Sequence, residues 1–109
     1  MALRENHVAI VEVAAQVTVD KGGSCATARL AVGGCVKPTR LRFVEETLER
    51  EGLGDRVLSE AAIRAAELVD PISDFHASGA YRRRLTRVLV GRALTRTTAM
   101  ARRIEKTDG

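Results

Sequence analysis

The sequence has 109 residues, of which 45% are apolar, 29% charged and 3% aromatic, and its formal net charge is +4. This length fits one small domain, so residues 1–109 are treated as a single unit, and the apolar fraction is too high for a disordered chain. No apolar run approaches the ~18 residues of a membrane helix, no signal peptide is recognisable, and two cysteines are too few for a disulfide scaffold. We therefore expect a cytoplasmic globular domain with one core and little room for a deep active site of its own.

The charge is unevenly distributed. Residues 1–80 contain 9 basic and 12 acidic side chains, whereas residues 81–109 contain 9 basic and 2 acidic ones. A basic segment of this kind binds phosphates in some proteins and faces water or a partner subunit in others. The three aromatic residues are scattered, so the sequence offers no platform for base stacking. We favour a solvated or subunit-facing helix over a nucleic-acid-binding one.

Residues 7–34 predict a β-hairpin. Within residues 7–19, the odd positions from Ala9 to Val19 form an unbroken row of apolar side chains, which is typical of a long strand with one buried face. Residues 20–23 (DKGG) supply turn chemistry, and residues 24–32 alternate again. A short extended piece at residues 39–42 completes a three-stranded antiparallel sheet.

From Phe43 onward the apolar spacing becomes helical. One helix is predicted to end at Gly52, a second to begin with Asp55 as its cap and to end before Pro71, and a third to span residues 79–106 with Ser78 as its cap. The stripe of the third helix is predicted as Tyr81, Leu85, Val88 and Leu89, with residues 82–84 (RRR) facing outward. Strands followed by helices predict an α+β two-layer sandwich, with three helices packed on one face of the sheet.

No cluster of residues indicates catalysis. The cysteines and histidines lack the spacing of a zinc site, so no metal is expected, and the carboxylates at residues 45–51 are interpreted as a solvated helix face. The glycine pairs lack the surroundings of a phosphate-binding loop. We expect no catalytic residue in this chain and interpret it as a domain that helps another protein work.

The order of these features resembles a known family, the C-terminal domain of the FAD-binding (medium) subunit of molybdenum hydroxylases, which include carbon monoxide and xanthine dehydrogenases. The resemblance covers nearly the whole chain and depends on four stretches. They are residues 4–11 (RENHVAIV), 28–34 (ARLAVGG), 38–48 (PTRLRFVEETL) and 70–94, the last containing DPISD, YRR and RAL. Two departures are His7, where the family usually has Asp, and residues 35–37, where smaller residues are usual.

The resemblance implies an accessory role in an oxidoreductase. The complete subunit would bind FAD in N-terminal lobes that this sequence lacks, and no FAD is expected on this chain alone. The domain would close one side of the flavin pocket, with Leu3 and Lys21 as weak candidates near the flavin, and would pack against the iron–sulfur subunit of a complex that also has a molybdopterin subunit. Two alternatives remain open: a small nucleic-acid-binding protein, and an oligomerisation module that pairs through the doubly apolar start of its first strand.

Overall fold

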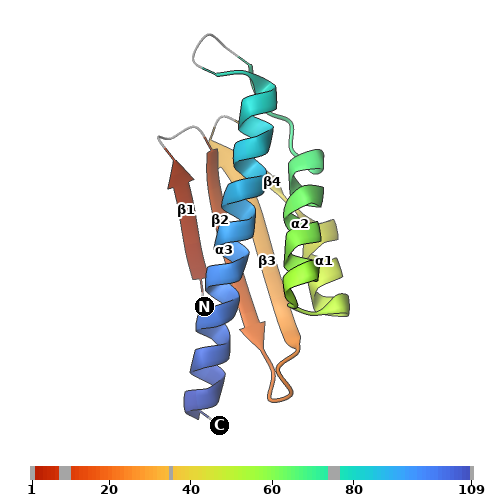
Figure 1. Cartoon of the computed structure of the whole chain (residues 1–109), viewed down its shortest axis with the longest axis vertical. Coiled ribbons are helices and arrows are strands. Elements are labelled where there is room, and N and C mark those ends of the chain that lie inside the picture. Colours follow the sequence, from red (N-terminus) through yellow and green to blue (C-terminus); the bar gives the residue numbers. More distant parts are fainter. Residues whose placement is uncertain (1, 8–10, 35, 74–76, 109) are drawn as a thin grey trace.

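The computed structural model describes residues 2–7, 11–34, 36–73 and 77–108. Its chain forms a four-stranded sheet followed by three helices that lie on one side of the sheet (Figure 1). The predicted α+β class, with an antiparallel sheet followed by three helices on one face, is therefore confirmed. The order of strands across the sheet is β1-β2-β3-β4, so each strand lies beside its neighbour in sequence.

The central hairpin agrees with the prediction. Strand β2 (Val11–Val19) pairs antiparallel with β3 (Cys25–Gly34), and Val13 lies opposite Val32. The odd-numbered residues of β2 from Val11 to Val17 are buried and the even-numbered ones are more exposed. The period-2 pattern thus identified both the strand and the face that packs on the helices.

The sheet has one strand more than predicted. Strand β1 (Ala2–His7) pairs antiparallel with β2, where the sequence predicted only a lead-in to one long strand over residues 7–19. Residues 8–10 of that prediction lie outside the described residues. The polar run at residues 4–7 hid this strand, because an edge strand need not show the apolar alternation of a buried one. Strand β4 (Thr39–Arg40), at the other edge, has two residues.

Glycines and a serine set the helix ends. Helix α1 (Arg42–Glu51) ends at Gly52, whose φ of 97° is a conformation that other residues adopt at a cost. Helix α2 (Asp55–Leu68) has Gly54 as its N-cap residue, so the predicted cap Asp55 is instead the first helical residue. The predicted cap of α3 (Gly79–Asp108) is confirmed, since the Tyr81 N–H donates to Ser78 Oγ at 3.0 Å.

The core lies between the helices and one face of the sheet. Helix α3 packs across β2 and β1, α1 packs on β3, and α2 packs against α3 and α1 (Figure 1). The fully buried side chains at its centre include Val13, Val17, Leu30, Leu48 and Leu94. None of the helices in the described part of the chain is long and apolar enough to cross a membrane.

The buried face of α3 differs from the prediction. Leu89 is buried, but Tyr81 and Val88 are 38% and 47% exposed, and Leu85 is half-buried. The buried residues of α3 are offset from the predicted stripe. They comprise the apolar Leu89, Val90, Ala93, Leu94 and Ala101 and the polar Arg82, Thr86, Thr97 and Thr98. Small and hydroxyl-bearing side chains let this helix lie close to the sheet, a requirement that a count of large apolar residues does not reveal.

Candidate functional site

The two predicted flavin-site residues lie at different positions along the direction of the strands. Leu3 is in β1 opposite Ala15, and Lys21 is in the turn that follows β2. Lys21 comes six positions after Ala15, which is at most about 20 Å along a strand. The structure therefore places Leu3 beside the middle of β2 and Lys21 at the tip of the hairpin, and it does not bring the two residues together.

The turn that carries Lys21 is held by hydrogen bonds. The Asp20 carboxylate accepts from the N–H groups of Gly22 at 2.9 Å and Ser24 at 3.0 Å, and Gly23 adopts a φ of 84°. Asp20 also exchanges two backbone hydrogen bonds, donating its N–H to Ser24 O and accepting from the Gly23 N–H. Lys21 is exposed, so this turn presents a cation at the tip of the hairpin.

The sheet face away from the helices is open. Small residues occupy its centre, because Ala14 lies opposite Ala31 and Gly33 lies opposite the half-buried Glu12. A shallow hollow of about 450 Å³ extends from this centre to Arg40 in β4. Within the described residues no element covers this face, so it is accessible to another protein surface (Figure 1).

The carboxylates of α1 follow the predicted solvated face only in part: Glu46 and Glu51 are exposed, whereas Glu45 and Glu49 turn toward β3. Glu45 is 3% exposed; its carboxylate accepts from the Leu30 N–H at 2.7 Å and from two nitrogens of Arg40, each at 3.0 Å at closest. Glu49, one turn later, accepts from the Ala28 N–H at 2.9 Å. Although burial alone would raise it, the hydrogen bonds from Arg40 and from the Leu30 N–H hold the pKa of the Glu45 carboxyl below its usual value.

These two carboxylates continue the pairing of β4. That strand pairs only with Ala31 and Val32, and its successor Leu41 donates to Leu30 O at 2.8 Å. Beyond that point the N–H groups of β3 turn to Glu45 and Glu49 instead of to a strand. The signal in the sequence was a very short extended piece followed by carboxylates four residues apart, which lie on one face of a helix.

The three consecutive arginines of α3 do not all face outward. The Arg82 side chain is buried and its Nη1 donates to Ile72 O at 2.6 Å, while Arg83 donates to the carbonyls of Ala66 and Glu67 at the end of α2. Carbonyls in the last turn of a helix lack helical partners, and guanidinium groups satisfy them well. Only Arg84 follows the prediction, and the inward-facing role assigned to Tyr81 belongs to Arg82.

The remaining titratable candidates show no reactive geometry. Burial raises the pKa of the Cys25 thiol to about 11, with Glu49 and Asp20 adding to the shift, and its Sγ donates to Thr27 O at 3.4 Å. Among the residues that the structure describes, no three His, Cys, Asp or Glu side chains gather as metal ligands. Cys35, His76 and the side chain of His7 lie outside that description.

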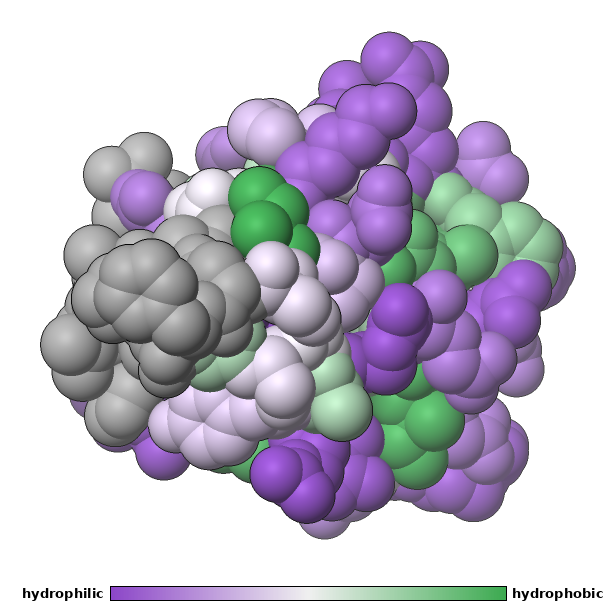
Figure 2. All heavy atoms as spheres, turned by 90° about the horizontal axis from the view of Figure 1, so that it is seen from above, coloured by the Kyte–Doolittle hydropathy of each residue, from purple (hydrophilic) through white to green (hydrophobic). Residues whose placement is uncertain are grey.

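The end of the molecule away from the β2–β3 turn has separate apolar spots on its surface. Seen from that end, hydrophobic residues are interrupted by hydrophilic ones rather than joined into one patch (Figure 2). The described chain thus offers an uncovered sheet face, a cationic turn and shallow grooves. Such features serve contacts with a partner better than they serve enclosure of a small substrate.

Comparisons with the sequences of known proteins give two matches. The model of the CO dehydrogenase flavoprotein C-terminal domain family matches residues 1–97. The 6-hydroxypseudooxynicotine dehydrogenase complex subunit alpha of Paenarthrobacter nicotinovorans is 33% identical over 100 residues, which cover 91% of this chain and 34% of that subunit.

Solved structures have the same fold. Quinoline 2-oxidoreductase from Pseudomonas putida 86 superposes with a TM-score of 0.78 at 26% identity, covering 93% of this chain and 35% of that one. Carbon monoxide dehydrogenase from Hydrogenophaga pseudoflava gives a TM-score of 0.82 at 20% identity over 90% of this chain and 36% of that one, a likeness of fold alone. The chain spans about a third of the length of each of these relatives.

Proposed function

The chain belongs to the CO dehydrogenase flavoprotein C-terminal domain family, and from this premise we propose that it acts as the C-terminal domain of the FAD-binding subunit of a molybdenum-containing hydroxylase. The match over residues 1–97 carries the proposal. A relative named as a subunit of a dehydrogenase complex supports it. We propose that residues 1–109 form one domain of a cytoplasmic complex, and that catalysis takes place on other polypeptides.

The domain would close one side of the flavin pocket. The residues available for this are the backbone around Leu3, beside the middle of β2, and the cationic Lys21 at the tip of the hairpin. They fit the edge of a flavin site better than its whole, because the sequence has no glycine-rich loop for the pyrophosphate. The N-terminal lobes of the complete subunit would hold FAD, which supplies two-electron acceptance from the substrate side and release to an acceptor. This chain would exclude water from one edge of the ring.

The partners in this proposal are the flavin-binding lobes, the iron–sulfur subunit and the molybdopterin subunit. The open face of the sheet supports such packing, since its small central residues Ala14, Ala31 and Gly33 permit a close approach. A domain that serves as one wall of a shared pocket has no need of an enclosed cavity of its own.

The test is a chimera in which this chain replaces the matching third of the 6-hydroxypseudooxynicotine dehydrogenase alpha subunit. The proposal predicts that the chimera retains FAD, measured as protein-bound flavin absorbance after gel filtration, whereas a subunit truncated at the same point loses it. A Lys21→Ala chimera should bind FAD more weakly, and Lys37→Ala, at another exposed lysine, serves as the matched control. A chimera that folds but carries no more flavin than the truncated subunit would overturn the proposal.

A second measurement uses the chain as bait in lysate of its source organism. Recovery of a flavoprotein together with iron–sulfur and molybdenum subunits, with the matching absorbance spectrum, would support the proposal. An eluate rich in nucleic acid and free of those subunits would favour the nucleic-acid-binding alternative.

A further inference from the structure

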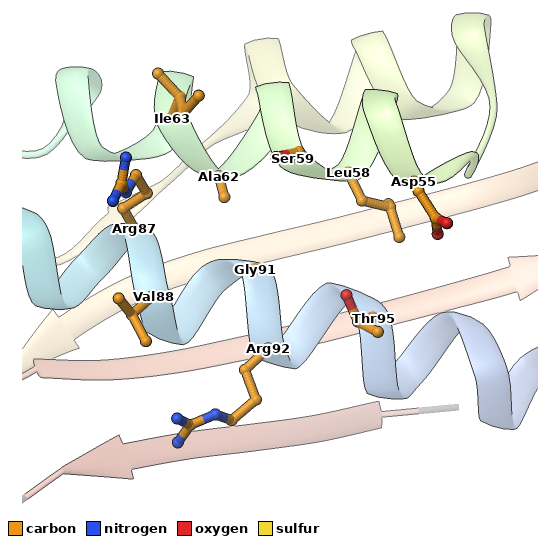
Figure 3. A pocket seen from close by; sticks show the side chains of 10 residues that line it. All are labelled: Asp55, Leu58, Ser59, Ala62, Ile63, Arg87, Val88, Gly91, Arg92 and Thr95. Atoms are coloured by element: carbon orange, nitrogen blue, oxygen red, sulfur yellow. The ribbon is translucent and has the colours of Figure 1, made fainter.

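A groove runs between α2 and α3 on the outer surface of the helical layer. It has a volume of about 540 Å³, and its floor is formed by the buried side chains of Leu58 and Ala62. Ile63 from α2 and Val88 from α3 border it and are 45% and 47% exposed (Figure 3). Large apolar side chains left half in water beside a hollow are typical of a surface that another molecule covers.

Gly91 lies in this groove near the middle of α3. A glycine inside a helix costs about 1 kcal/mol relative to alanine. Internal packing does not demand it, because an added Cβ would meet the Ala62 Cβ at 3.5 Å, an ordinary van der Waals contact. The bare backbone at this position therefore gives the fold no advantage, whereas it lets a partner approach the helix closely.

Two uncompensated positive charges flank Gly91. Arg87 and Arg92 are exposed, and neither has an ion-pair partner in the described part of the chain, whereas Arg56 and Arg64 on α2 each pair with a glutamate. Arg87 extends between the two helices and Arg92 extends from α3 on the side away from α2 (Figure 3). A partner lying over Gly91 would thus meet a guanidinium group on each side.

We propose that this groove docks an amphipathic helix of another protein, with apolar side chains between Ile63 and Val88 and carboxylates against Arg87 and Arg92. A helix fits because it satisfies its own backbone hydrogen bonds, which a floor of Leu58 and Ala62 cannot do for an extended segment. It would lie over the antiparallel pair α2 and α3, on the side of these helices away from the sheet.

The sign of the charges favours a protein over a nucleic acid as the occupant. Asp55 lies at the end of the groove opposite Arg87 and would repel a phosphate backbone there (Figure 3). The apolar side chains along the border offer no hydrogen bond or charge to a phosphate group. A protein helix can place its carboxylates near Arg87 and a neutral or basic residue near Asp55. This proposal is independent of the flavin-subunit assignment, since it concerns a different face of the molecule.

The test uses the full chain and a synthetic helix of about four turns, built from Leu, Ala and Glu with blocked ends. Binding is measured by fluorescence anisotropy, and the contact surface is mapped by amide chemical shifts. We expect saturable binding with the largest shifts in α2 and α3 around Ala62 and Gly91. The same peptide with Lys in place of Glu should not bind.

Matched double variants separate the groove from diffuse attraction. Arg87→Glu with Arg92→Glu should weaken peptide binding at least about tenfold. Arg84→Glu with Lys106→Glu changes the net charge equally on exposed positions of the same helix and should change binding less than about threefold.

Glycine variants test the close approach. Gly91→Gln should weaken binding about as much as the groove double variant, because its side chain occupies the docking surface. Gly91→Ala should fold with a raised thermal midpoint, which confirms that the position accepts a side chain.

Three results would overturn the proposal. One is the absence of saturable binding of the acidic peptide to the folded chain. Another is an equal loss of binding in both double variants, which would indicate a diffuse basic surface. The third is displacement of the peptide by a DNA duplex whose binding depends as strongly on Arg84 and Lys106 as on the groove arginines. Flavin retention by the chimera tests the proposed function, and none of these three results changes the outcome of that test.

Discussion

The arginines of the first 80 residues and those of α3 are used differently. In the described part of residues 1–80, five arginines lie 2.9–3.8 Å from a glutamate carboxylate: Arg29, Arg40, Arg50, Arg56 and Arg64. In α3, by contrast, Arg82, Arg83 and Arg102 reach backbone carbonyls, and Arg87 and Arg92 reach no acidic side chain of the described chain. The first 80 residues thus pair five guanidinium groups with glutamates, whereas α3 uses some of its arginines to fix the fold and leaves others available to a partner.

The largest expected effect concerns the buried carboxylate within the first 80 residues, that of Glu45. Glu45→Gln removes the charged acceptor of the Leu30 N–H and the partner of Arg40, so we expect the free energy of unfolding to fall by about 2–3 kcal/mol. Urea denaturation measures this change. Glu46→Gln, at the exposed neighbouring position, should change stability by less than about 0.5 kcal/mol. Similar losses in both variants would mean that Glu45 does not stabilise the β3 edge.

The buried arginine of α3 should come next. Arg82→Met keeps much of the side-chain volume but removes the donor to Ile72 O, and we expect a loss of about 2 kcal/mol with local loosening of the segment before α3. Hydrogen exchange of the amides around Ile72 and Gly79 would detect that loosening. Arg84→Met, at an exposed site, should leave both quantities unchanged; a stability loss confined to Arg84→Met would reverse our assignment of the two side chains.

Protonation of the Glu45 carboxyl should lower the free energy of unfolding by less than its substitution does. The folded-state pKa of Glu45 is lowered, so its contribution is complete above the unfolded-state value of about 4.3 and is lost as the pH falls through the folded-state value. Below about pH 4.5 the wild-type chain should lose stability more steeply than Glu45→Gln. Parallel pH profiles of the two proteins would contradict this assignment.

The smallest effect is expected at an exposed ion pair within the first 80 residues. Arg56 and Glu60 lie one turn apart on α2, 2.9 Å from each other, with side chains 74% and 60% exposed. Arg56→Ala should cost no more than about 0.5 kcal/mol, and 1 M salt should remove most of the difference from wild type. A loss as large as that of Glu45→Gln would show that exposure does not separate the two classes of pair.

The sequence by itself determined the elements whose cause is local. The alternation of residues 11–19, the turn at Asp20, the stop at Gly52 and the cap at Ser78 all predicted what the structure contains. Each depends on interactions within a few residues, which periodicity and turn chemistry record directly. The family resemblance, which depends on the order of these features, was confirmed for the same reason.

Only the tertiary structure decided which polar side chains are buried. Glu45 turns inward because β4 ends after two residues and leaves the Leu30 N–H in need of an acceptor 15 residues away. Arg82 turns inward in place of Tyr81 because carbonyls of the α2–α3 connection lie beneath it. In both cases the deciding partner is distant in sequence. A hydrogen-bonding group is buried where the folded chain brings its complement, and local patterning carries no record of that meeting.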